Sequence, residues 1–201
     1  LQNLAASLGR ILQDIPDVHS VRWRVKSPEH LISKIVRKKL SGTEKYKDIS
    51  LENYQSKVTD LVGLRVLHLF KTELESLHHA ITSVWDSVEV PTAYVRAGDT
   101  DELRQLYEKV GLQVEDHSDG YRSVHYTIRS SITKNAVTWE LQVRTIFEEG
   151  WSEIDHRIRY PDFSDDARVG EFLQIFNRLC GAADEMGTFV RRLVASLDDA
   201  Q

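Results

Sequence analysis

The chain has 201 residues, of which 41% are hydrophobic and 28% are charged, so a packed core is expected and global disorder is excluded. The net charge of -5 argues against a protein held on nucleic acid by bulk charge, and we expect no DNA partner. A single cysteine, Cys180, excludes an intrachain disulfide and a cysteine zinc cluster, and no apolar run is long enough for a membrane span.

The first third of the chain predicts two helices separated by a basic strand. Residues 1–14 place apolar side chains on one helical stripe, which a proline ends. Residues 19–26 alternate between apolar and polar, mostly basic, side chains, as a half-exposed strand does. Ser27 and Pro28 then have the chemistry of a helix N-cap and first turn. The residues expected to face inward from that helix are Leu31, Ile32, Ile35 and Val36.

The middle of the chain predicts a buried strand followed by a helix. Residues 41–48 have the composition of a mobile polar loop, and residues 50–60 predict a short helix. Residues 62–70 are nearly all apolar, which is typical of a strand covered on both faces. Thr72 and Glu75 have the spacing of a capping box at the start of the next helix.

The next segment predicts three strands around one helix. Residues 88–95 predict an edge strand because a proline interrupts them, and residues 100–110 predict a helix that ends at a glycine. Two further strands, over residues 112–116 and 121–129, are expected to form a hairpin around Gly120.

Residues 137–145 alternate most cleanly of all. One face of the predicted strand carries Val137, Trp139, Leu141 and Val143. The other face carries Thr138, Glu140, Gln142 and Arg144. The first face predicts core, whereas the second fits either a solvated surface or a row of working side chains. Thr145 and Glu148 predict another capping box.

This order of elements predicts one α+β domain over residues 1–201, with a mixed sheet of about five strands flanked by helices. A cytoplasmic location is a separate expectation. The core is expected over about residues 20–160, and C-terminal helices over residues 165–198, with glycines as breaks. The apolar stripes of those helices would complete the core or join another subunit, so a homo-oligomer is one expectation.

A basic cluster is the first candidate site. Nine Lys or Arg residues lie between Arg22 and Lys47, in a chain that is acidic overall. The basic face of the strand over residues 19–26 runs into the helix start at Ser27, where cations and free backbone N–H groups converge. This arrangement predicts a polyphosphate site, although a solvated charged face gives the same pattern.

Two carboxylates form the second candidate site. Asp60 precedes the buried strand over residues 62–70, and Glu140 lies on another strand. Magnesium is usually held by one or two carboxylates plus substrate phosphates, so the pair is a candidate Mg²⁺ site. Asp60 alone would be an ordinary turn residue or helix cap. Strict alternation puts Asp60 and Arg65 on opposite faces, so they share a site only if Asp60 lies at a bend.

A polar aromatic strand face and a histidine complete the candidates. Tyr121, Ser123 and His125 share one face, where they could stack on a base and bind a phosphate, or form an ordinary exposed surface. Trp151 lies on an apolar helical stripe and is expected to pack in the core. His156 lies off that stripe and is either a plain polar residue or directed back to the sheet.

Taken together and in this order, five motifs resemble the synthetase domain of the RelA/SpoT family, the alarmone synthetases. The motifs are Arg24-Val25-Lys26-Ser27-Pro28-Glu29, Asp60-Leu61-Val62-Gly63-Leu64-Arg65-Val66, Gly120-Tyr121-Arg122-Ser123-Val124-His125, Glu140-Leu141-Gln142-Val143-Arg144-Thr145, and Trp151 with His156. The resemblance implies a nucleotidyltransferase-like fold. It also implies transfer of the β,γ-pyrophosphate of ATP to the 3′-hydroxyl of GTP or GDP, with release of AMP.

The resemblance also implies roles for individual residues. ATP would contact Arg24, Lys26, Lys34 and Arg65. The cofactor Mg²⁺ would bind Asp60, while Glu140 would be the general base or a second metal ligand. The acceptor nucleotide would contact Tyr121, Ser123, His125, Gln142, Arg144 and His156.

The loop before Tyr121 departs from the family pattern. Family members commonly have Asn and Lys there, whereas this chain has Glu115, Asp116 and Asp119. This difference leaves open a toxin-type member that pyrophosphorylates adenosine nucleotides or the 3′ end of tRNA. A third reading is a non-catalytic nucleotide-binding module, against which the pair of Asp60 and Glu140 argues.

Overall fold

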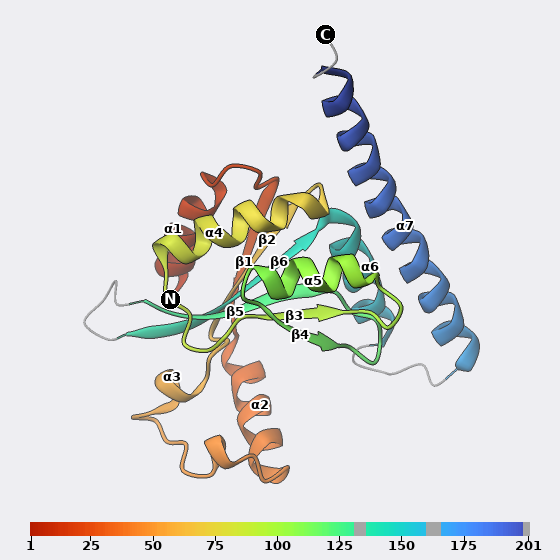
Figure 1. Ribbon diagram of the computed structural model, residues 1–201. Coiled ribbons are helices and arrows are strands. Elements are labelled where there is room, and N and C mark those ends of the chain that lie inside the picture. The colour runs from red at the N-terminus through yellow and green to blue at the C-terminus, as the bar shows by residue number, and fades with distance from the viewer. Residues whose placement is uncertain (131–135, 160–165, 199–201) are drawn as a thin grey trace.

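The centre of the molecule is a mixed β-sheet (Figure 1). A computed structural model describes residues 1–130, 136–159 and 166–198. All six strands predicted along these residues join one sheet, for which about five strands were expected. The strands are β1 (Ser20–Val25), β2 (Val62–His68), β3 (Thr92–Val95), β4 (Gln113–Asp116), β5 (Ser123–Ser130) and β6 (Val137–Thr145). Their order across the sheet is β1-β2-β6-β5-β3-β4, with parallel pairing of β2 to β6 and of β3 to β4.

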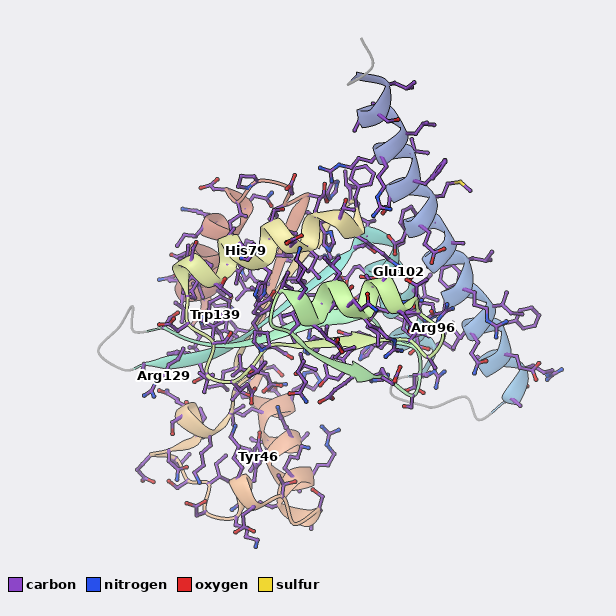
Figure 2. The ribbon with its side chains drawn as sticks, viewed as in Figure 1. Tyr46, His79, Arg96, Glu102, Arg129 and Trp139 are labelled. Atoms are coloured by element: carbon purple, nitrogen blue, oxygen red, sulfur yellow. The ribbon has the colours of Figure 1, made fainter. Side chains whose placement is uncertain are left out.

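One face of the sheet is covered by three helices and carries the main core. These helices are α1 (Gln2–Gln13), α4 (Leu74–Val84) and α5 (Asp101–Lys109). The apolar side chains of the central strands pack with them in one cluster, as the alternation predicted. Trp139 lies fully buried inside this core (Figure 2), edge-on to Trp85, and its indole N–H donates to the hydroxyl of Ser130 at 2.9 Å.

A small lobe beside the sheet holds α2 (Pro28–Leu40), the 3₁₀ turn η1 (Glu44–Tyr46) and α3 (Tyr54–Lys57) (Figure 1). Ser27 caps α2 as predicted, by accepting from the N–H of His30. The inward placement of Ile32 and Val36 is wrong, because they are 61% and 50% exposed. The lobe has a small apolar cluster of its own, and from α2 only Leu31 and Ile35 pack against it. Buried Tyr46, labelled in Figure 2, anchors the segment expected to be a mobile polar loop.

The predicted hairpin between β4 and β5 is wrong. β3 lies between these two strands and pairs with both of them. The reason is topological: α5 connects β3 to β4, and a helical crossover of this kind returns the chain parallel to the strand it left. The predicted capping box at Thr72 is also wrong, because the carboxylate of Glu73 accepts from the N–H groups of Leu69 and Phe70 instead, each at 3.0 Å.

The second face of the sheet is partly covered by α6 (Ile146–Arg159), which contacts β2 and β6, while α7 (Ala167–Asp198) packs against α6 and the 3₁₀ turn η2 (Lys71–Glu73). The capping box of Thr145 and Glu148 at the start of α6 is confirmed. The breaks expected at glycines are wrong, since α7 is one helix whose far end extends beyond the sheet (Figure 1). At Gly181 a Cβ would lie 3.2 Å from a guanidinium nitrogen of Arg122, so this glycine serves close packing. The expected core boundary at residues 160–165 lies outside the described residues.

No helix among the described residues combines the length and apolar character that crossing a bilayer demands. The longest of them, α7, has charged side chains among its exposed apolar ones.

A buried carboxylate ties α7 to the junction of β6 and α6. Asp184 is 1% exposed, and one oxygen accepts from the hydroxyl of Thr145 at 2.9 Å while the other has no hydrogen-bond partner. Burial raises the pKa of Asp184 to about 7, and the charge of Glu148 adds to that effect. Lys71 and His68 face the same carboxyl group and act in the opposite direction.

Asp184→Asn is expected to stabilise the protein by on the order of 2 kcal/mol more at pH 8 than at pH 5. Between an ordinary Asp value near 4 and the folded value of about 7, the folded state binds more protons than the unfolded state. The carboxyl group therefore costs stability as the pH rises through this window, and the amide removes that cost. Urea midpoints at the two pH values measure the effect, and an equal shift at both would contradict it.

Candidate active site

The sheet register places the predicted polar side chains in two rows that cross neighbouring strands. From β1 through β2 to β6, the first row consists of Arg24, Gly63 and Glu140. From β2 through β6 to β5, the second row consists of Arg65, Gln142 and His125. Because paired residues direct their side chains to the same face, both rows point away from the main core.

An open pocket of about 410 Å³ lies over these rows. The predicted site residues that line it are Arg24, Arg65, Glu140, Gln142 and His156. Gly63 lies between Arg24 and Glu140 in the first row and has no side chain to cover its backbone. A Cβ added there would contact the Arg24 side chain, 3.7 Å from its Nε. A ligand can therefore approach the strand closely at this point.

Glu140 is partly buried and is held by His125. Its Oε1 lies 3.2 Å from Nδ1 of His125, whose Nε2 lies 3.0 Å from the hydroxyl oxygen of Tyr121. Burial raises the pKa of Glu140, but the hydrogen bond and charge of His125 outweigh burial and hold that pKa below its ordinary value. Glu140 is therefore a carboxylate at neutral pH, and His125 connects it to Tyr121.

Asp60 lies in the turn before β2, which is the bend that a shared site with Arg65 requires. Its two oxygens lie 2.9 Å from Nζ of Lys26 and 2.7 Å from Nζ of Lys34. Burial raises the pKa of Asp60, but the two ammonium groups more than offset this and hold it below the ordinary value. The charge of Asp60 also raises the pKa of Glu140, so the two carboxylates act on each other.

If a metal binds here, these two carboxylates would be its protein ligands. In the part of the chain that the structure describes, no group of three or more His, Cys, Asp or Glu side chains could hold a metal ion by itself. Oδ1 of Asp60 is buried and makes no hydrogen bond of good geometry, although Lys34 is near. Two carboxylates fit an ion such as Mg²⁺ when substrate phosphates complete its coordination.

Tyr121 belongs to a cluster of four aromatic rings. Its ring centroid lies 5.3 Å from that of His117, 5.7 Å from that of His125 and 6.3 Å from that of Tyr94. The guanidinium of Arg144 lies over the Tyr121 ring, 4.9 Å from the centroid, and donates to its hydroxyl at 2.6 Å. These contacts fix the ring, and burial raises the pKa of Tyr121.

Two of the predicted acceptor-binding residues are buried. Arg144 is 1% exposed and donates to Tyr121 and Gln142. Ser123 is 4% exposed, and its hydroxyl donates to the carbonyl oxygen of Val143 at 3.4 Å. Both side chains thus support their neighbours, and their direct contact with an acceptor stays a prediction.

Several residues of this site were missed in the sequence, among them His117 of the ring cluster. Tyr94 could have been found, because the alternation of residues 92–95 places it on the polar face. Glu149 and Glu153 are spaced four apart in α6 and share the helix face that meets the sheet. Arg65 donates to both of them. Helical spacing alone does not show which strand a helix face will meet.

Comparison with known proteins adds a family and a fold. Residues 23–165 match the family model described as the region found in RelA / SpoT proteins. Among curated proteins, the chain is 26% identical over 147 residues to the GTP pyrophosphokinase YwaC of Bacillus subtilis (strain 168). This match covers 71% of the chain and 59% of YwaC, so it spans less than two thirds of that relative.

Solved structures share the fold. A GTP pyrophosphokinase family protein from Streptococcus pneumoniae has a TM-score of 0.69 at 19% identity, over 98% of this chain and 91% of that one. The small alarmone synthetase 1 from Bacillus subtilis has a TM-score of 0.66 at 20% identity, over 97% and 94%. The same synthetase bound to its product pppGpp has a TM-score of 0.64 at 21% identity, over 97% and 92%.

Proposed function

Because the chain belongs to the RelA/SpoT family, we propose that it transfers the β,γ-pyrophosphate of ATP to the 3′-hydroxyl of GTP or GDP and releases AMP. The observation that carries this proposal is the position of Glu140. It lies in the pocket between the cations of β1 and β2 on one side and the ring cluster of Tyr121 on the other.

The donor half of the site is cationic. Arg24 and Arg65 line the pocket, and Lys26 and Lys34 pair with Asp60, whose charge acts on Glu140. Phosphoryl-type transfer depends mainly on positioning and on neutralising charge on the phosphates. We assign these cations to ATP, with Arg24 free to stack on adenine above the open backbone of Gly63.

The acceptor half provides the nucleophile. The nucleotide base would lie against the ring cluster of Tyr121, with Gln142 on the polar wall. The 3′-oxygen forms a bond to the β-phosphorus while the bond from that phosphorus to the oxygen bridging to the α-phosphate breaks, and AMP leaves. The hydroxyl proton passes to Glu140, a carboxylate whose advantage as a base is its position.

Magnesium would be held by Asp60 and Glu140 together with the phosphates of ATP. When bound, it would neutralise phosphate charge during transfer. Asp60 is in contact with Lys26 and Lys34. We propose that these lysines turn to the phosphates when ATP binds, which frees the carboxylate for the ion.

The acidic loop before Tyr121 bears on which acceptor the site takes. Two of its acids form ion pairs, Asp116 with Arg104 at 2.6 Å and Asp119 with Arg159 at 3.5 Å. Their charges are therefore partly offset, so the loop does not exclude a phosphate-bearing acceptor such as GDP or GTP. Transfer to adenosine nucleotides or to the 3′ end of tRNA is the alternative that the acidic loop favours.

Incubation with labelled ATP and Mg²⁺ separates these acceptors. GDP, GTP, ADP and bulk tRNA are offered in parallel, and released AMP and labelled acceptor are measured. Label in GDP and GTP with equal AMP is the expected result. Label confined to ADP or tRNA would show that this molecule, and not GDP or GTP, is the acceptor. No transfer to any of the four would reject the proposed function.

A further inference from the structure

Glu149 is the most heavily paired acid next to the pocket. It lies in the first turn of α6, where a helix dipole favours a carboxylate, and it is 5% exposed. A buried carboxylate costs several kcal/mol unless cations and hydrogen bonds compensate. The cations that contact Glu149 are therefore the groups that compensate its burial.

Among the described residues, three guanidinium groups surround Glu149. Its Oε1 accepts from Arg22 at 3.3 Å and from Arg65 at 3.1 Å, and its Oε2 lies 3.3 Å from Nη1 of Arg144. These arginines come from the three adjacent strands β1, β2 and β6. One carboxylate thus bridges three neighbouring strands, and two of its partners, Arg22 and Arg65, line the pocket.

The partners of Glu149 serve both halves of the pocket. Arg65 lines the pocket on the donor side. Arg144 is buried, and it positions the ring of Tyr121 because its guanidinium lies over that ring and donates to the Tyr121 hydroxyl. A displacement of Glu149 would therefore release a donor-side cation and an acceptor-side aromatic ring together.

We propose that Glu149 is a positioning residue that fixes Arg65 directly and Tyr121 through Arg144, and so holds the two nucleotide subsites at a set separation. The inference rests on the proposed function, because transfer from one nucleotide to another requires both subsites to be aligned. Glu149 itself touches neither nucleotide in this account.

Glu153 provides a matched control. It lies one helical turn further along α6 and is on the same helix face. Among the ion pairs of the described residues, Glu153 contacts Arg65, whereas Glu149 contacts Arg65 and Arg144. Removing the charge of Glu153 should therefore disturb the donor side alone.

The test measures binding without turnover. Calorimetry on the full chain gives the Kd of a non-hydrolysable ATP analogue and the Kd of GDP for the wild type, Glu149→Gln and Glu153→Gln. Glu149→Gln is expected to weaken both ligands by about tenfold. Glu153→Gln should change the affinity for the ATP analogue and leave GDP within about twofold. Glu149→Asp, which keeps the charge on a shorter side chain, should recover part of both affinities.

Two results would overturn the inference. One is a folded Glu149→Gln protein with wild-type affinity for either nucleotide, whatever its melting temperature. The other is the same pattern for Glu149→Gln and Glu153→Gln. If Glu149→Gln fails to fold, Glu149→Asp takes its place and must weaken both ligands. A wild type that binds both nucleotides but releases no AMP would reject the proposed function and leave this test intact.

Discussion

Glu140→Gln is expected to lower the kcat of pyrophosphate transfer by roughly 10²–10⁴-fold, the range that a positioned general base contributes. The amide keeps the size of the side chain but cannot take the proton of the 3′-hydroxyl. It can still accept a hydrogen bond from His125, so the ring cluster should stay in place. Affinity for an ATP analogue should change little, because the donor-side cations are unaltered.

The control for this variant is Glu108→Gln, an exposed glutamate on α5 on the opposite face of the sheet. It should match the wild type in both rate and stability. If Glu140→Gln unfolds, Glu140 is structural and the assignment as base fails. If it folds and transfers at the wild-type rate, the proton passes to another group and the assignment fails as well.

Asp60→Asn is expected to separate two effects that move in opposite directions. Transfer in the presence of Mg²⁺ should fall by roughly 10²-fold, about 3 kcal/mol of barrier, because a ligand to the ion is lost. Affinity for ATP without Mg²⁺ should rise, because Lys26 and Lys34 no longer face a carboxylate. Steady-state kinetics across a Mg²⁺ titration and calorimetry with EDTA present measure the two effects.

Asp48→Asn is the matched control, since Asp48 forms an ion pair with Lys57 in the same lobe. It should leave both measurements unchanged. An Asp60→Asn protein with the wild-type dependence on Mg²⁺ would remove Asp60 from the metal site. Unchanged or weaker binding of metal-free ATP would show that the lysines do not exchange from Asp60 to phosphate.

Local patterns in the sequence predicted what depends on local chemistry. The alternation of β6 separated core residues such as Trp139 from Glu140 and Gln142, and this separation holds in the structure. The cap residues Ser27 and Thr145 were predicted because N-capping involves only neighbouring residues. The order of motifs along the chain then sufficed to indicate the family.

What was missed depends on long-range pairing. The position of β3 between β4 and β5 is decided by which strands pair, and a hairpin is only the simplest guess from two strands in sequence. Glu149 contacts arginines of three strands because of the position at which α6 packs on the sheet. The spacing of residues within α6 does not reveal that position. Likewise, α2 looked like a core helix by periodicity, but the lobe has too little apolar surface to cover Ile32 and Val36.

The central claim is that this pocket moves a pyrophosphate group from ATP to a nucleotide hydroxyl near Glu140. The most direct measurement incubates the protein with Mg²⁺, GDP and ATP labelled at both the β- and γ-phosphorus, and identifies the products by mass and ³¹P NMR. We predict AMP in equal amount to a guanosine product that carries both labels on its 3′-oxygen. Release of ADP with one transferred phosphate, or no labelled guanosine product, would contradict the account.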